Sequence, residues 1–127
     1  MQKILFIIYV EDQNRSKVFY ENILGIKPIL DVPGMTEFQI NPYTKLGIMP
    51  EAGIANLLGF KVPHITERNS LPKCEIYLFV NDPQQAYFNA INNGAKPICE
   101  VKVYDWGDEV AYCSDMDENI IAFAKTI

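Results

Sequence analysis

Apolar and polar positions follow a pattern that occurs twice along the chain. Residues 6–12 read FIIYVED, and residues 76–82, 70 positions later, read IYLFVND. Residues 25–29 read GIKPI, and residues 94–98, 69 positions later, read GAKPI. Self-similarity at a nearly constant spacing indicates a duplicated structural unit. Each apolar run is short enough for a strand and ends at an acidic or amide residue, which is typical of a helix start.

A helix is predicted after each of these runs. Asp12 and Asp82 are suited to accept hydrogen bonds from the first free amides, and Pro83 suits a first helical turn. Gly25 and Gly94 suit the left-handed conformation that ends a helix. The apolar stripes at helical spacing are Val18, Phe19 and Ile23 in the first copy, and Ala86, Tyr87, Ala90 and Ile91 in the second.

Extended segments follow each predicted helix and are separated by turn residues. They cover residues 29–32, 36–40 and 46–49 in the first copy, and 98–104, 109–113 and 120–124 in the second. We therefore expect an α+β fold of two tandem βαβββ units, residues 1–50 and 73–127. The connector between them, residues 51–72, is expected to have little regular structure. A chain of 127 residues has room for one domain built from two such half-domain repeats.

The first strand of each unit has two faces of different composition, because side chains alternate along a strand. One face consists of Phe6, Ile8 and Val10 in the first unit and of Ile76, Leu78 and Val80 in the second, which suits burial beneath a helix. The other face consists of Leu5, Ile7 and Tyr9 in the first unit and of Glu75, Tyr77 and Phe79 in the second. Aromatic rings with one carboxylate favour a ligand-binding surface, although a second core or a dimer interface has the same composition.

Charge and cysteine content narrow the classes of function. The net charge is −5, from 11 Lys and Arg against 16 Asp and Glu, so the basic surface of a nucleic-acid-binding protein is not expected. Cys74, Cys99 and Cys113 are too widely spaced for a metal knuckle and odd in number, so we expect small buried side chains. The first apolar run is too short to span a membrane and lacks a signal-peptide cleavage site. We expect a cytoplasmic protein without nucleic-acid or membrane partners.

Three further segments carry a family resemblance. Residues 16–25 read SKVFYENILG, residues 106–108 read WGD, and residues 115–121 read DMDENII. With the two repeated units, these segments resemble the vicinal oxygen chelate superfamily, which contains glyoxalases, bleomycin-resistance proteins and extradiol dioxygenases. The resemblance implies that the mixed and antiparallel sheets curl into a cup, with the helices on the outer face. It also implies a homodimer.

The resemblance implies metal-ligand positions as well. Enzymes of this superfamily hold a divalent metal with His and Glu side chains, and by position these ligands correspond to Leu5, Glu75, Ala122 and one residue of 47–49. Only Glu75 can coordinate a metal ion. The single histidine, His64, lies in the connector, so a site with two His ligands is excluded. We therefore expect neither a metal nor another cofactor.

The favoured hypothesis is a metal-free binding protein of the glyoxalase/bleomycin-resistance type. It would hold a partly aromatic small molecule in the cup, with a cationic one favoured by the acidic residues Asp105, Asp108 and Glu109. The expected ligand-binding residues are Leu5, Ile7, Tyr9, Glu75, Tyr77, Phe79 and Trp106.

Two alternatives stay open. The first is a lyase or dioxygenase-like enzyme, which would use either a metal with atypical ligands or Glu75 as a general base. Burial disfavours the charged form of a carboxyl group, so a buried Glu75 would be the better base. The second is an accessory dimeric domain whose cup is filled by its own side chains.

Overall fold

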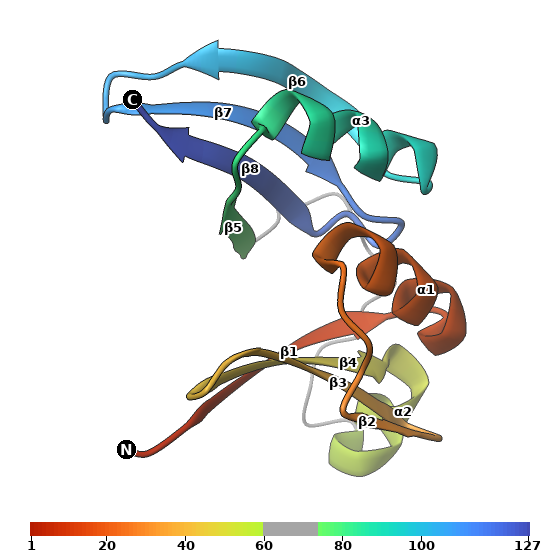
Figure 1. The fold of residues 1–127 in the computed structure, drawn as a ribbon. Coiled ribbons are helices and arrows are strands. Elements are labelled where there is room, and N and C mark those ends of the chain that lie inside the picture. Colours follow the sequence, from red (N-terminus) through yellow and green to blue (C-terminus); the bar gives the residue numbers. More distant parts are fainter. Residues whose placement is uncertain (60–73) are drawn as a thin grey trace. The chain divides into compact units, whose positions relative to one another are not determined.

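The structure, a computed structural model, describes residues 1–59 and 74–127. The chain divides into two compact units, Met1–Ser70 and Leu71–Ile127, and each unit contains a sheet of its own (Figure 1). His64 and most of the expected connector lie outside the described residues. None of the described helices is both long and apolar enough to cross a membrane.

Both units have the same strand order and the same pairing. The elements of the first unit are β1 (Ile4–Val10), α1 (Gln13–Leu24), β2 (Leu30–Val32), β3 (Met35–Asn41), β4 (Thr44–Pro50) and α2 (Glu51–Leu58). Those of the second unit are β5 (Glu75–Phe79), α3 (Pro83–Asn92), β6 (Lys96–Val103), β7 (Asp108–Ser114) and β8 (Ile120–Thr126). The sheet orders are β1-β4-β3-β2 and β5-β8-β7-β6, and in each sheet only the first listed pair is parallel. The prediction of an α+β fold with two βαβββ units is confirmed.

The helix ends follow the predicted capping chemistry. The Asp12 side chain accepts a hydrogen bond from the amide of Arg15, and Asp82 accepts one from Gln85. Gly25 ends α1 with a φ of 69°, in the left-handed region that costs glycine no steric strain. The aspartate caps explain why α1 and α3 begin at corresponding positions of the two units. α3 ends at Asn92 with Asn93 as its C-cap, and Gly94, which was expected to end the helix, follows that cap with a φ of 106°.

The buried stripe of α1 differs from the predicted one. Phe19 is buried as expected, but Val18 is exposed and Tyr20 is buried in its place, together with Ser16. In α3, Tyr87 and Ala90 are buried as predicted. The helices pack against the central and outer strands of their sheets, α1 on β3 and β4, and α3 on β6, β7 and β8.

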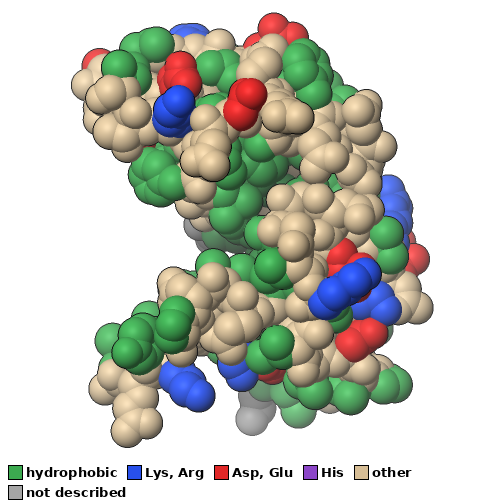
Figure 2. All heavy atoms as spheres, in the orientation of Figure 1, with side chains coloured by type: hydrophobic (Ala, Val, Ile, Leu, Met, Phe, Trp, Pro, Cys, Tyr) green, Lys and Arg blue, Asp and Glu red, His purple; other side chains and the backbone are tan. Residues whose placement is uncertain are grey.

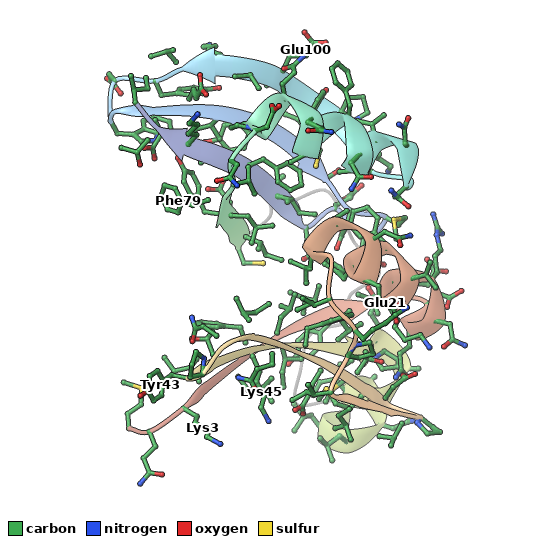
Figure 3. The ribbon with its side chains drawn as sticks, in the orientation of Figure 1. Lys3, Glu21, Tyr43, Lys45, Phe79 and Glu100 are labelled. Carbon is green, nitrogen blue, oxygen red and sulfur yellow. The ribbon has the colours of Figure 1, made fainter. Side chains whose placement is uncertain are left out.

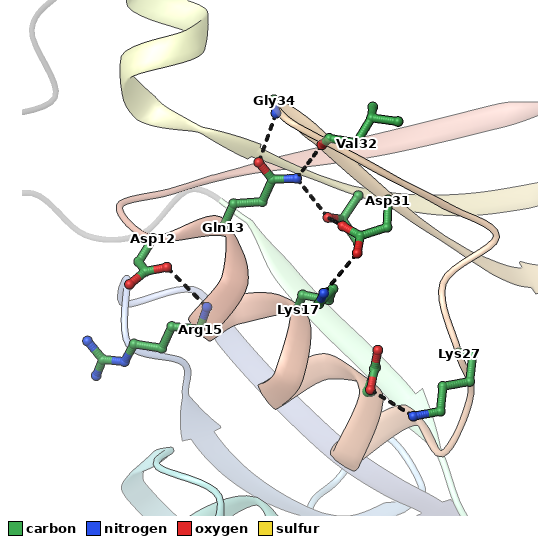
Figure 4. A network of polar contacts seen from close by, with 10 residues as sticks. Asp12, Gln13, Arg15, Lys17, Lys27, Asp31, Val32 and Gly34 are labelled. Carbon is green, nitrogen blue, oxygen red and sulfur yellow. Dashed lines mark hydrogen bonds and ion pairs between the residues drawn. The ribbon is translucent and has the colours of Figure 1, made fainter.

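A polar network connects the start of α1 to the β2–β3 hairpin (Figure 4). The Gln13 amide group donates to the Val32 carbonyl at 2.8 Å and to the Thr36 hydroxyl at 2.9 Å, and it accepts from the Gly34 amide at 2.9 Å. Lys17 Nζ lies 2.8 Å from an Asp31 carboxylate oxygen, and this hydrogen bond lowers the pKa of Asp31. These contacts fix the hairpin on the helix and are structural.

The prediction of little regular structure after residue 50 is wrong for its first part, because Glu51–Leu58 form the helix α2. Pro50 precedes the helix with extended backbone, and Glu51 places an acidic side chain in the first turn. Ile54 is buried and supplies the tertiary contact that a helix of two turns requires. α2 and α1 lie on opposite sides of the first sheet, as Figures 1 and 4 show.

Candidate functional site

The sheet register separates the two faces of each first strand as predicted. In the first unit, Ile8 and Val10 are buried, whereas Tyr9 between them is exposed. In the second unit, Leu78 pairs with buried Phe123, while Tyr77 pairs with Ala122 on the other face. Phe6 is the exception, since it is 60% exposed although it shares a face with Ile8. α1 packs mainly on β3 and β4, so the edge strand β1 receives little cover from it.

The predicted residues of the first unit lie together on the face away from α1. A Cβ atom at Gly47 would lie 3.2 Å from both Leu5 and Ile7, so these side chains cover the glycine. Lys45 projects from β4 on the same face and forms an ion pair with Glu37 at 3.3 Å (Figure 3). Leu5, Ile7 and Tyr9 are all partly exposed, and they form an apolar surface beside one ion pair.

The second unit carries a cluster of aromatic side chains on the face away from α3. This aromatic cluster consists of Tyr77, Phe79, Tyr104, Trp106 and Tyr112. Tyr104 and Trp106 are stacked at 4.5 Å between ring centroids, and Tyr77 meets Phe79 edge-on at 5.3 Å. The side chains beneath the cluster are small and fully buried: Val110, Ala122 and Ala124. Figure 2 shows hydrophobic side chains together on the surface over β5 and β8.

A chain of hydrogen bonds runs through the aromatic cluster. Trp106 Nε1 donates to the Tyr77 hydroxyl at 3.0 Å, and this hydroxyl donates to Asp108 Oδ2 at 2.8 Å. Asp108 is 9% exposed, so its carboxylate lies at the edge of the protein interior. Burial and the neighbouring Asp108 raise the pKa of Tyr77, while the hydrogen bond from Trp106 acts in the opposite sense. Tyr77 is therefore protonated at neutral pH and can act as the donor to Asp108.

The other two tyrosines of the cluster are held in their neutral form as well. The Tyr104 hydroxyl lies 3.7 Å from Cys99 Sγ, and this contact together with burial raises the pKa of Tyr104 to about 12. Burial also raises the pKa of Tyr112. Lys102 Nζ lies 5.2 Å from the centre of the Tyr104 ring, in the range of a cation–π contact. An aromatic face of the cluster thus already has a cation beside it.

The seven residues predicted to bind ligand fall into two groups, one in each unit. The structure brings Tyr77, Phe79 and Trp106 together, and Trp106 is 54% and Phe79 66% exposed. Glu75 begins the same strand and shares the face of Tyr77, but it is exposed. The burial that would make Glu75 a better base is therefore not present.

Several residues of this face were missed or misplaced by the sequence analysis. Tyr104, Tyr112 and Lys102 were missed. Alternation along β7 places Tyr112 on the same face as Asp108 and Val110, and Lys102 of β6 lies opposite Val110. Glu109, one of the acidic residues expected to favour a cationic ligand, lies on the other face of β7, opposite Lys125 in the strand register. Of the three cysteines expected to be buried, only Cys113 is; Cys99 is partly exposed and Cys74 is exposed.

The metal positions implied by the resemblance do not fit a metal ion. Leu5, Ala122 and residues 47–49 bring no imidazole or carboxylate, and Glu75 alone brings one. Among residues 1–59 and 74–127, no group of three His, Cys, Asp or Glu side chains is placed to share an ion. The space beside Glu75 on this face is occupied by the aromatic cluster instead.

Comparisons with solved structures show the same fold. The hypothetical protein SA1046 from S. aureus has 23% sequence identity and a TM-score of 0.80, with 98% of this chain and 94% of that chain covered. A glyoxalase/bleomycin resistance protein/dioxygenase family enzyme from Burkholderia phytofirmans PsJN has 16% identity and a TM-score of 0.83, with 97% of each chain covered. A glyoxalase-related enzyme from Fulvimarina pelagi has 17% identity and a TM-score of 0.82, with 99% of this chain and 89% of that chain covered. None of the curated proteins compared with the chain matches it.

The family assignment follows from the sequence match to a family model. The model of the glyoxalase-like domain matches residues 3–127, which include both repeated units. This match agrees with the resemblance to the vicinal oxygen chelate superfamily and with the structural neighbours. The chain therefore belongs to the glyoxalase-like domain family.

Proposed function

We propose that this protein binds a partly aromatic, cationic small molecule on the aromatic cluster of the second unit, without a metal ion. The observation that carries the proposal is the set of exposed ring faces, Trp106 and Phe79, beside the carboxylates of Asp108 and Glu75. Exposed aromatic rings with a few polar groups are typical of small-molecule sites. Leu5, Ile7 and Tyr9, on the sheet of the first unit, are proposed as further ligand-binding residues.

The energetics of the exposed rings favour a flat cation. An aromatic pair contributes about 0.5–1.5 kcal/mol beyond the area that it buries. A partly desolvated cation over an aromatic face contributes about 2 kcal/mol. Lys102 already lies over the Tyr104 ring, so the exposed rings of Trp106 and Phe79 are the ones proposed to meet the ligand.

The donor set supports binding without a metal and weakens the enzyme alternative. A dioxygenase or glyoxalase reaction needs a metal that polarises the substrate oxygens. Only Glu75 among the matched positions could hold one, and Glu75 is too exposed to be the buried base of a metal-independent reaction.

The test is ligand binding by wild-type protein and matched variants. A panel of flat organic cations and neutral analogues is screened by thermal shift, and hits are measured by calorimetry. We expect Trp106→Ala to weaken binding by about fivefold or more, since it removes a stacking partner. Tyr43→Ala, at an exposed aromatic residue of the first unit, is the control and should bind as the wild type does. Equal affinity in Trp106→Ala would show that the site lies elsewhere.

The proposal includes a homodimer in the cytoplasm. The exposed apolar residues of β1, with Phe6 the most exposed of them, support a self-association surface. The free thiols of Cys74, Cys99 and Cys113 fit a reducing compartment. Sedimentation velocity of wild type and Phe6→Ser tests the dimer: a wild-type monomer contradicts it, and a shift of the variant towards monomer supports it.

A further inference from the structure

We propose that Tyr77 and Asp108 are positioning residues that hold Trp106 in its stacked orientation and make its exposed ring face selective for cations. This inference rests on the proposed function, because it concerns the same aromatic cluster. It adds a specific role for Asp108, which is linked to Trp106 by hydrogen bonds through Tyr77.

The backbone brings Trp106 to this position by a tight turn between β6 and β7. The Tyr104 amide donates to the Asp108 carbonyl at 2.9 Å, and the Gly107 amide donates to the Tyr104 carbonyl at 3.2 Å. Gly107 has a φ of 94°, a conformation that other residues rarely adopt. The turn places the Trp106 ring on Tyr104, and 54% of the Trp106 surface is exposed.

The donor and the acceptor of both hydrogen bonds in the series Trp106–Tyr77–Asp108 are fixed by the chemistry of its two end groups. An indole N–H can only donate, so the Tyr77 oxygen must be the acceptor from Trp106. An ionised carboxylate can only accept, so the Tyr77 proton goes to Asp108. Tyr77 is the one link that satisfies both groups. Its loss would leave the indole N–H and a nearly buried carboxylate without these partners.

The direction of these two hydrogen bonds also decides which part of Trp106 is open to a ligand. Its N–H is engaged by Tyr77, so the ligand meets the ring face and not a hydrogen-bond donor. Hydrogen bonds in series polarise one another. The negative charge of Asp108, transmitted through Tyr77, therefore makes the indole more electron-rich. The ring face of Trp106 attracts a cation more strongly than that of a tryptophan hydrogen-bonded to water.

The positioning role can be measured without any ligand. Trp106 is the protein's only tryptophan, so a proton–nitrogen correlation spectrum contains one indole N–H signal. We expect its exchange with water to be about fivefold faster in Tyr77→Phe than in wild type, since one hydrogen bond is lost. Tyr112→Phe is the control, because it removes a hydroxyl on the same face that takes no part in the hydrogen bonds between Trp106, Tyr77 and Asp108. An unchanged exchange rate in Tyr77→Phe would overturn the positioning role.

The selectivity is measured with a cationic and a neutral probe of similar shape, N-methylquinolinium and quinoline. Asp108→Asn keeps an acceptor for Tyr77 and removes only the charge, so the ratio of the two affinities should fall by about fivefold. Glu109→Gln removes a neighbouring charge on the other face of β7 and should leave the ratio unchanged. An equal fall in both variants would show a general charge effect and overturn the role of Asp108. If wild type binds neither probe, the cation selectivity is overturned, while the exchange measurement still decides on the positioning of Trp106.

Discussion

The buried thiol of Cys113 makes the stability of the second unit depend on alkaline pH. Cys113 lies on β7 with no exposed surface. Burial, with a smaller effect of Asp115, raises its pKa from the ordinary 9.0 to about 12. In the unfolded chain the thiol regains access to water and ionises at its ordinary pKa. Raising the pH above 9 therefore favours the unfolded state.

The size of this effect follows from the two pKa values. Between them, the folded state binds more protons than the unfolded state, so stability is complete below the lower value and decreases as the pH rises. At about pH 10.5 the thiolate form of Cys113 outnumbers the neutral thiol about 30-fold in the unfolded chain, whereas the thiol of the folded protein stays mostly neutral. This ratio corresponds to a loss of about 2 kcal/mol in the free energy of unfolding.

Urea denaturation at about pH 8 and about pH 10.5 measures the loss, with the fluorescence of Trp106 as the signal. Trp106 and Cys113 lie in the same unit, so the signal reports on the relevant part of the chain. Other groups also titrate at high pH, and comparison with Cys113→Ala cancels their contribution. The alanine variant lowers stability by a pH-independent amount through its smaller side chain. We expect the wild type to lose about 2 kcal/mol more than Cys113→Ala between the two conditions.

Equal losses in wild type and Cys113→Ala would refute this reasoning. They would mean that the thiol ionises as easily in the folded protein as in the unfolded chain, and hence that β7 is not packed as described. Cys74→Ala, at an exposed thiol, is the matched control. Its loss with pH should follow that of the wild type.

Three further predictions address the turn at the site, the first unit and the metal. Gly107→Ala should lower the free energy of unfolding by about 1 kcal/mol in urea denaturation, because φ is 94° and no neighbouring atom is near enough to compensate; unchanged stability would contradict this. Gln13→Ala removes three hydrogen bonds and should speed hydrogen exchange of the Gly34 amide by about tenfold. Gln84→Ala, at an exposed position of α3, is the control and should leave this exchange rate unchanged. Chelator treatment should leave the affinity for N-methylquinolinium unchanged, because Glu75 is the only donor at the matched ligand positions. A loss of affinity that added metal restores would contradict binding without a metal.

The repeated pattern predicts most of the fold because the two units use the same local chemistry. Asp12 and Asp82 cap their helices, and Gly25 and Gly94 both have positive φ. These features need no knowledge of distant contacts. α2 was not predicted because Pro and Gly surround its short sequence, and its stability depends on the burial of Ile54, which is a tertiary contact. The exposure of Phe6 was missed for a related reason, since strand alternation assigns a face but not the length of the helix above it.

The candidate site could be predicted only as far as single strands allow. Alternation along β5 places Tyr77 and Phe79 on one face, and composition singles out Trp106 as the only tryptophan. The contact between Tyr77 and Asp108 joins residues 31 positions apart, and it exists because β8 lies between β5 and β7 and sets their register. Small side chains on β8, Ala122 and Ala124, then leave space in which the rings of both neighbouring strands can meet. The position where the family resemblance implies a metal ligand, Ala122, is thus part of what makes room for the aromatic cluster.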